Sequence, residues 1–204
     1  MITIIDYGVG NINAFVNVYK RLNIPTKIAK TASDLIDAKK LILPGVGHFD
    51  HAMNELNKSG MKEKLNELVI NDKLPVIGIC VGMQMMANNS DEGKLEGLGW
   101  IDANVRKFDE TNIKQVTKLP HMGWNDVSPA KKHPLFDGLE KEALFYFLHS
   151  YYFECNNPQD ILATSDYGGT FSAAANFENV YGIQFHPEKS HHYGEMLLNN
   201  FAKL

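Results

Sequence analysis

The first half of the chain alternates short apolar runs of strand character with runs whose apolar residues recur at helical spacing. Strand-like runs begin at Ile2, near Lys27, and in "KLILPGVG" and "PVIGIC". Between them, helical periodicity covers Ile12 to Leu22 and Met61 to Val69. This strand–helix–strand order predicts an α/β fold, in which a mostly parallel central sheet carries helices on both faces.

The second half is richer in strands. After Trp100 the strand-like runs are "GWIDANVRKF", "LFYFLHSYYFEC", "DILATSDYG" and "VYGIQFHP", with few helices between them. We therefore expect a mixed or antiparallel extension of the sheet, followed by a final helix with Tyr193, Met196, Leu197 and Phe201 on one face. Because no repeat or low-complexity linker divides the chain, we expect one domain.

Composition excludes several classes of function. The net charge is −4 and no long basic run is present, so nonspecific nucleic-acid binding lacks electrostatic support. The longest apolar stretch, Leu74 to Ala87, contains Pro75 and is too short to span a bilayer. The N-terminus reads as a strand and not as a signal peptide. We expect a cytoplasmic protein with reduced thiols at Cys80 and Cys155.

The sequence "GICVG" places Cys80 between Gly78 and Gly82, where a strand pattern gives way to a helix pattern. This G-x-C-x-G arrangement is the thiol counterpart of the nucleophile elbow of hydrolases. The following helix would present its N-terminus to Cys80 and favour the thiolate. The N–H of Val81 would be free to bind an oxyanion. A buried structural cysteine is the alternative, since free cysteines are usually buried.

A thiolate nucleophile needs a base, and "GIQFHPEKS" offers one. His186 ends an apolar strand, and residues two apart in an extended segment project to the same side, so Glu188 can orient the His186 ring. A surface turn is the alternative for this tripeptide. The pairs His48/His51 and His191/His192 are rivals, but neither has companions at metal-ligand spacing, and we expect both on the solvated surface.

The sequence "LPGVGHFD" places glycines directly after a buried strand. Gly45 and Gly47 permit backbone conformations closed to other residues, so this loop can offer N–H groups to an anion or an oxyanion. The signal is weak by itself, because any strand-to-helix turn can contain glycines.

Taken together, "PGVG", "GICVGMQ" and "QFHPEKS" in this order resemble the class I (triad) glutamine amidotransferases, over essentially all of residues 1–204. The resemblance implies a single type 1 amidotransferase domain with a flavodoxin-like fold. Within the family, the chain looks most like the glutaminase subunit of imidazole glycerol phosphate synthase, an enzyme of histidine synthesis. The supporting segments are "DYGVGN", "PHMGWN" and "LHSYYF", with Lys189 and Ser190 directly after the HPE sequence.

The resemblance also implies a chemistry. Cys80 would attack the side-chain amide of glutamine, and His186, oriented by Glu188, would move the protons. Gln84 lies four residues after Cys80 on the same predicted helix, so its amide would lie on the face of the nucleophile. The implied glutamine and oxyanion pocket consists of Gly45, Val46, Gly47, Val81, Gln84, Ser150 and Tyr151. No cofactor or metal is expected.

The resemblance further implies a partner, a (β/α)8-barrel cyclase subunit that receives the ammonia. Met122, Trp124, Asn125 and Lys189 would lie at this interface, since large adaptable side chains are common there. The alternative for Trp124 is burial in the core.

The sequence is compatible with three other functions. The segments "NINAFVNVYKRLN" and "EGLGWIDANVRKF" look more like paralogues that supply ammonia for cell-surface sugars. A stand-alone γ-glutamyl or cysteine hydrolase would act without a partner, which the "PHMGWN" segment argues against. A catalytically silent binding subunit is disfavoured by the intact Cys80, His186 and Glu188.

Overall fold

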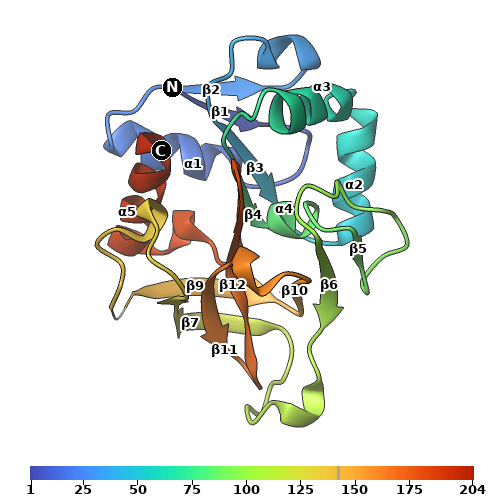
Figure 1. Ribbon diagram of the computed structural model, residues 1–204, viewed down its shortest axis with the longest axis vertical. Helices are drawn as coiled ribbons and strands as arrows, with labels where there is room; N and C mark the ends of the chain where they lie inside the picture. The colour runs from blue at the N-terminus through green and yellow to red at the C-terminus, as the bar shows by residue number, and fades with distance from the viewer. Residues whose placement is uncertain (142) are drawn as a thin grey trace.

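A computed structural model describes residues 1–141 and 143–204 of the chain. Its core is a sheet whose first five strands run parallel in the order β2-β1-β3-β4-β13 (Figure 1). All residues of β1, β3, β4 and β13 are buried, as expected for a parallel sheet covered on both faces. The five strands are β1 (Ile2–Ile5), β2 (Thr26–Ala29), β3 (Leu41–Gly45), β4 (Val76–Cys80) and β13 (Val180–Ile183).

The predicted extension of the sheet is confirmed. Antiparallel pairing continues from β13 through β12 and β10 to β6, which pairs in parallel with the short β5. A branch from β12 runs through β11 to β8. These strands are β5 (Asn89–Ser90), β6 (Ala103–Lys107), β8 (Ser128–Pro129), β10 (Tyr151–Cys155), β11 (Ile161–Asp166) and β12 (Thr170–Phe177).

Helices cover both faces of the parallel strands, as predicted. Figure 1 shows α1 (Ile12–Arg21) and α5 (His191–Lys203) on one side, and α2 (Phe49–Lys58) and α3 (Lys62–Asn66) on the other. The shorter turns are the 3-10 segments Ala32–Leu35, Glu110–Asn112, Pro134–Phe136, Pro158–Asp160 and Pro187–Lys189, and the π-helical turn Glu67–Asn71. Within the described ranges, every helix is too short or too polar to cross a membrane.

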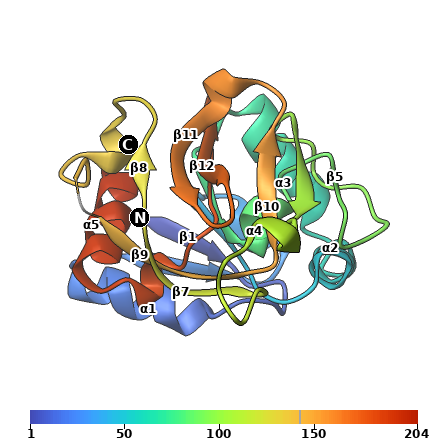
Figure 2. The same cartoon turned by 90° about the horizontal axis from the view of Figure 1, so that it is seen from below.

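One expected strand is in fact two. The run "LFYFLHSYYFEC" bends at Ser150, so β9 (Leu144–His149) leaves the main sheet and pairs with β7 (His121–Asp126) in a separate antiparallel sheet (Figure 2). The bend lets β9 pack its inward side chains on the core, where the rings of Phe145 and Phe185 lie 4.1 Å apart.

The carboxyl ends of three parallel strands meet at one edge of the sheet. Gly45 at the end of β3 is paired with Cys80 at the end of β4, and β13 ends nearby at Ile183, three residues before His186. The polar residues that follow these strands therefore converge, in the place where open α/β sheets bind ligands.

Candidate active site

Cys80 sits at a strained turn between β4 and α4 (Val81–Gln84). Its φ is 56° and its ψ is −113°, a conformation that L-residues rarely adopt. The neighbouring glycines make the turn possible, because a Cβ on Gly82 would lie 2.0 Å from the carbonyl oxygen of Leu43, and one on Gly78 would lie 2.6 Å from the carbonyl oxygen of Gly82.

The helix after Cys80 is shorter than the sequence suggested. It has a single turn of four residues, so its dipole is small and contributes little positive potential at Cys80. The positive group at this site is instead a side chain, His186.

His186 and Glu188 form a buried pair. His186 Nδ1 lies 2.8 Å from Glu188 Oε1, and the two side chains are 4% and 3% exposed. The segment between them is a 3-10 turn and not the extended segment predicted, although the predicted contact is made. The backbone N–H of His186 donates to Tyr146 O at 2.8 Å, which fixes the ring's position beside Cys80.

The contacts of His186 determine its charge. Burial lowers the pKa of His186, but hydrogen bonds to Cys80 and Glu188 and the negative charge of both outweigh burial and raise it to about 10. Glu188 occupies Nδ1, which leaves Nε2 for Cys80. The arrangement therefore favours a protonated His186 beside Cys80 at neutral pH.

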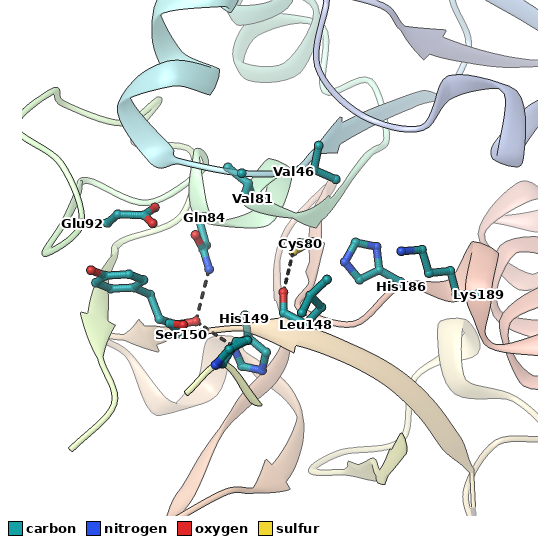
Figure 3. A pocket seen from close by; sticks show the side chains of 13 residues that line it. Val46, Cys80, Val81, Gln84, Glu92, Leu148, His149, Ser150, His186 and Lys189 are labelled. Carbon is teal, nitrogen blue, oxygen red and sulfur yellow. Dashed lines mark hydrogen bonds between the residues drawn. The ribbon is translucent and has the colours of Figure 1, made fainter. Parts of the chain in front are cut away.

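A cavity of about 380 Å³ opens above these residues. Figure 3 shows Cys80 between two ends of the cavity, with His186 and Lys189 on one side and Gln84 and Glu92 on the other. Of the pocket residues expected from sequence, Val46, Gly47, Val81, Gln84, Ser150 and Tyr151 line it.

Gly45 does not line this cavity. It is buried against the elbow, where a Cβ would lie 2.2 Å from the N atom of Gly82. Its smallness lets β3 and α4 approach each other, which is a packing role and corrects its assignment to the pocket.

The PGVG loop is fixed at one end and open at the other. The Tyr7 hydroxyl donates to Pro44 O at 2.7 Å, so the start of the loop is anchored. Val46 is 42% exposed, and Gly47 has a φ of +83° with no atom within 4 Å of the position of a Cβ. The peptide between Val46 and Gly47 therefore lies on an exposed and sterically open part of the cavity wall.

Similarity to known proteins agrees with this geometry. The family model described as "Glutamine amidotransferase class-I" matches residues 3–204. The chain belongs to the class-I glutamine amidotransferases. It is 59% identical to the imidazole glycerol phosphate synthase subunit HisH of Bdellovibrio bacteriovorus, over 100% of both chains. It is 51% identical to the HisH subunit of Leptospira borgpetersenii, again over 100% of both chains.

Solved structures share the fold of this chain. A crystal structure described as a glutamine amidotransferase matches with a TM-score of 0.76 at 20% identity, over 99% of this chain and 97% of the other. Because the sequence identity is low, this match supports the fold of this chain and nothing finer.

Two of the four residues expected at the partner interface lie on the solvent-exposed face of β7. Met122 and Trp124 on β7 are 64% and 45% exposed, so Trp124 is not part of the core. Asn125 points to the opposite face, because successive side chains of a strand alternate, and its amide donates to Asp166 O at 2.8 Å. Lys189 lies at the cavity mouth, with Nζ 5.6 Å from the ring centroid of Tyr146.

The other histidines considered as the catalytic base lie on the surface, as expected. They are all exposed: His48, His51, His191 and His192. Cys155 is half-buried, and burial raises the pKa of its thiol to about 11, which makes it a poor nucleophile. Both thiols are free.

Sequence reasoning missed three polar residues of the site. Glu92 lines the cavity from the loop after β5, and no local pattern indicated it. His149 lines the cavity next to Ser150. Gln184 donates from Nε2 to Cys80 Sγ at 3.7 Å. The quoted motif "QFHPEKS" begins with Gln184, two residues before His186, so strand alternation could have identified it.

Proposed function

We propose that this chain is the glutaminase subunit of an imidazole glycerol phosphate synthase. It would act as one type 1 amidotransferase domain over residues 1–204, in the cytoplasm, where a free reactive thiol persists. The observation that carries the proposal is the buried Cys80–His186–Glu188 arrangement, in which Cys80 and His186 line a cavity of about 380 Å³. The names of relatives up to 59% identical over the full chain supply the pathway.

The proposed reaction runs through a thioester. The Cys80 thiolate attacks the side-chain carbonyl carbon of glutamine. The developing oxyanion accepts hydrogen bonds from the N–H of Val81 and from that of Val46 or Gly47. His186 gives its proton to the departing ammonia. It then takes a proton from the water that hydrolyses the thioester, which releases glutamate and the free thiol. Glu188 keeps the ring oriented and stabilises its charged form.

The cavity offers groups for the rest of the substrate. Glu92 is the one carboxylate among the residues that line the cavity. Within the described part of the chain, only its Oε2 is occupied, by the N–H of Phe49 at 2.8 Å. We assign the α-ammonium of glutamine to this carboxylate. Both amide hydrogens of Gln84 bond to protein acceptors, Tyr151 O and Gln184 Oε1, so only its oxygen is left for a substrate N–H.

The proposed partner docks on the outer face of β7 and β9. Met122, Trp124, Leu144 and Leu148 are all exposed on this face, and Leu148 also lines the cavity. An apolar face beside the site where ammonia forms is suited to a subunit that must receive ammonia before it is lost to water. The partner in the proposal is a (β/α)8-barrel cyclase, with Lys189 facing one of its acidic residues.

Glutaminase activity should depend on this partner. We expect slow hydrolysis by the isolated chain and a stimulation of about 10²- to 10³-fold by the barrel subunit with an acceptor analogue, because one oxyanion donor is worth that much in turnover. The proposed structural basis is the exposed peptide of the PGVG loop. This peptide would rotate between two orientations, and only one of them would aim its N–H at the oxyanion. The measurement is glutamate release with and without the partner. Equal rates in both conditions refute partner control.

Two variants locate the effect. Val46→Pro removes the Val46 N–H, so a normal response in this variant would assign the donor to Gly47. Trp124→Ala should weaken partner binding. The partner concentration needed for stimulation should rise by at least about tenfold. Phe177→Ala is the matched control, because Phe177 is also 45% exposed but lies on β12, outside the proposed face.

The same stimulation assay addresses the alternative acceptor. Ammonia supply for cell-surface sugars requires identical chemistry at Cys80, so only the acceptor separates the two pathways. Stimulation by an amino-sugar precursor with its own partner, and none by the histidine-pathway precursor, would replace the proposed pathway and leave the glutaminase assignment standing.

A further inference from the structure

A chain of buried and half-buried polar groups lies between β7 and β9, on the face opposite Met122 and Trp124. His121 and His149 are directly paired across the two strands, and His121 Nδ1 lies 2.9 Å from His149 Nε2. His149 Nδ1 lies 2.7 Å from Tyr151 O. Asn125 Nδ2 lies 3.3 Å from His121 Nε2 and donates its second hydrogen to Asp166 O. The triad does not include any of these groups.

The acceptors fix the position of every proton in this chain. A carbonyl oxygen only accepts, so His149 must carry its proton on Nδ1 and donate to Tyr151 O. His149 Nε2 is then an acceptor, and His121 donates to it from Nδ1. His121 Nε2 in turn accepts from Asn125. Both rings are therefore neutral with the proton on Nδ1.

The buried surroundings keep both rings neutral. Burial lowers the pKa of His121 to about 4. Burial, and then the neighbouring His121, lower that of His149 to about 3, with a further contribution from the charge of His186. The charge of His186 thus adds to burial in keeping His149 neutral.

The chain continues to the nucleophile. Tyr151 O, which accepts from His149, also accepts from Gln84 Nε2 at 3.2 Å. Gln84 Nε2 donates as well to Gln184 Oε1 at 3.1 Å, and Gln184 Nε2 contacts Cys80 Sγ. Leu148 O, on the other side of His149, lies 3.9 Å from Cys80 Sγ. Figure 3 shows the contacts of Cys80, Gln84 and His149 together.

We propose that His149, held as the Nδ1–H tautomer by the Tyr151 carbonyl and by a hydrogen bond from His121, is a positioning residue for glutamine. It fixes the Tyr151 carbonyl and so turns the Gln84 amide to leave its oxygen facing the substrate. This inference rests on the proposed glutaminase function and adds to it a group that acts through Tyr151 and Gln84.

The test compares two replacements of His149. His149→Phe keeps an aromatic ring and removes both hydrogen bonds, and we expect the KM for glutamine to rise about 10- to 100-fold with a smaller change in kcat. His149→Asn places an amide N–H near the position of Nδ1, so it should recover part of the KM. Titration with a glutamine-mimicking alkylator gives the active fraction, so a purely structural defect would lower that fraction and leave KM unchanged.

A second readout needs no variant. Ring ¹⁵N NMR of the wild-type protein should show two histidines as neutral Nδ1–H tautomers that do not titrate between pH 5 and 8. A wild-type KM in a well-folded His149→Phe, or an Nε2–H or titrating form of His149 in that range, overturns the inference. Absence of glutaminase activity in the wild-type protein would instead refute the proposed function, which keeps the two failures distinct.

Discussion

Cys80→Ala is expected to abolish glutamine hydrolysis and to leave the fold intact. Removing the nucleophile of a covalent hydrolase costs on the order of 10⁶-fold in turnover, which places the variant below detection. The thiol contributes little bulk to the core, so the circular dichroism spectrum and the thermal midpoint should stay close to those of the wild type. Cys80→Ser should behave in the same way, since its hydroxyl is a far weaker nucleophile at neutral pH.

Chemical labelling tests the same residue without a mutation. A glutamine-mimicking alkylator should modify Cys80 and spare Cys155, whose thiol has a pKa raised to about 11 by burial. Peptide mass spectrometry locates the label. Preferential labelling of Cys155, or full activity in Cys80→Ala, is incompatible with Cys80 as the nucleophile.

His186→Ala should be nearly as damaging as loss of the thiol, and Glu188→Gln should be milder by about two orders of magnitude. Glu188 acts only through the His186 ring, so its amide analogue keeps some orientation and loses the charge stabilisation. Initial rates of glutamate release measure both. His51→Ala is the control, because His51 is exposed on α2. A silent His48→Ala enzyme beside an active His186→Ala enzyme would mean that the wrong histidine is assigned.

Much of this site could be predicted because its residues follow strand ends. Parallel strands bring their carboxyl ends to one edge, so Cys80, the PGVG loop and His186 were bound to converge once the strands were recognised. The glycines around Cys80 were informative for a physical reason, since the Cβ positions show that side chains there would collide with backbone.

The remaining features depend on contacts that no local pattern encodes. The bend at Ser150 divides one strand-like run between two sheets, although its residues favour a continuous strand. The position of Asn125 in sequence predicts that it lies with Met122 and Trp124, yet the alternation of β7 turns it to the opposite face of the strand. Glu92 reaches the cavity because Asp50 holds its loop, accepting hydrogen bonds from the N–H groups of Lys94 and Leu95. Asp50 is more than 40 residues away from these donors in sequence.

Transfer of the amide nitrogen is the most direct test of the account. The complex of this chain with the barrel subunit is supplied with glutamine labelled with ¹⁵N in the side-chain amide, the cyclase precursor and an excess of unlabelled ammonium at neutral pH. The account predicts ¹⁵N in the imidazole product in a one-to-one ratio with glutamate, and none when Cys80→Ala replaces the wild-type chain. A product that carries nitrogen from the bulk ammonium, with glutamate released independently, would contradict it.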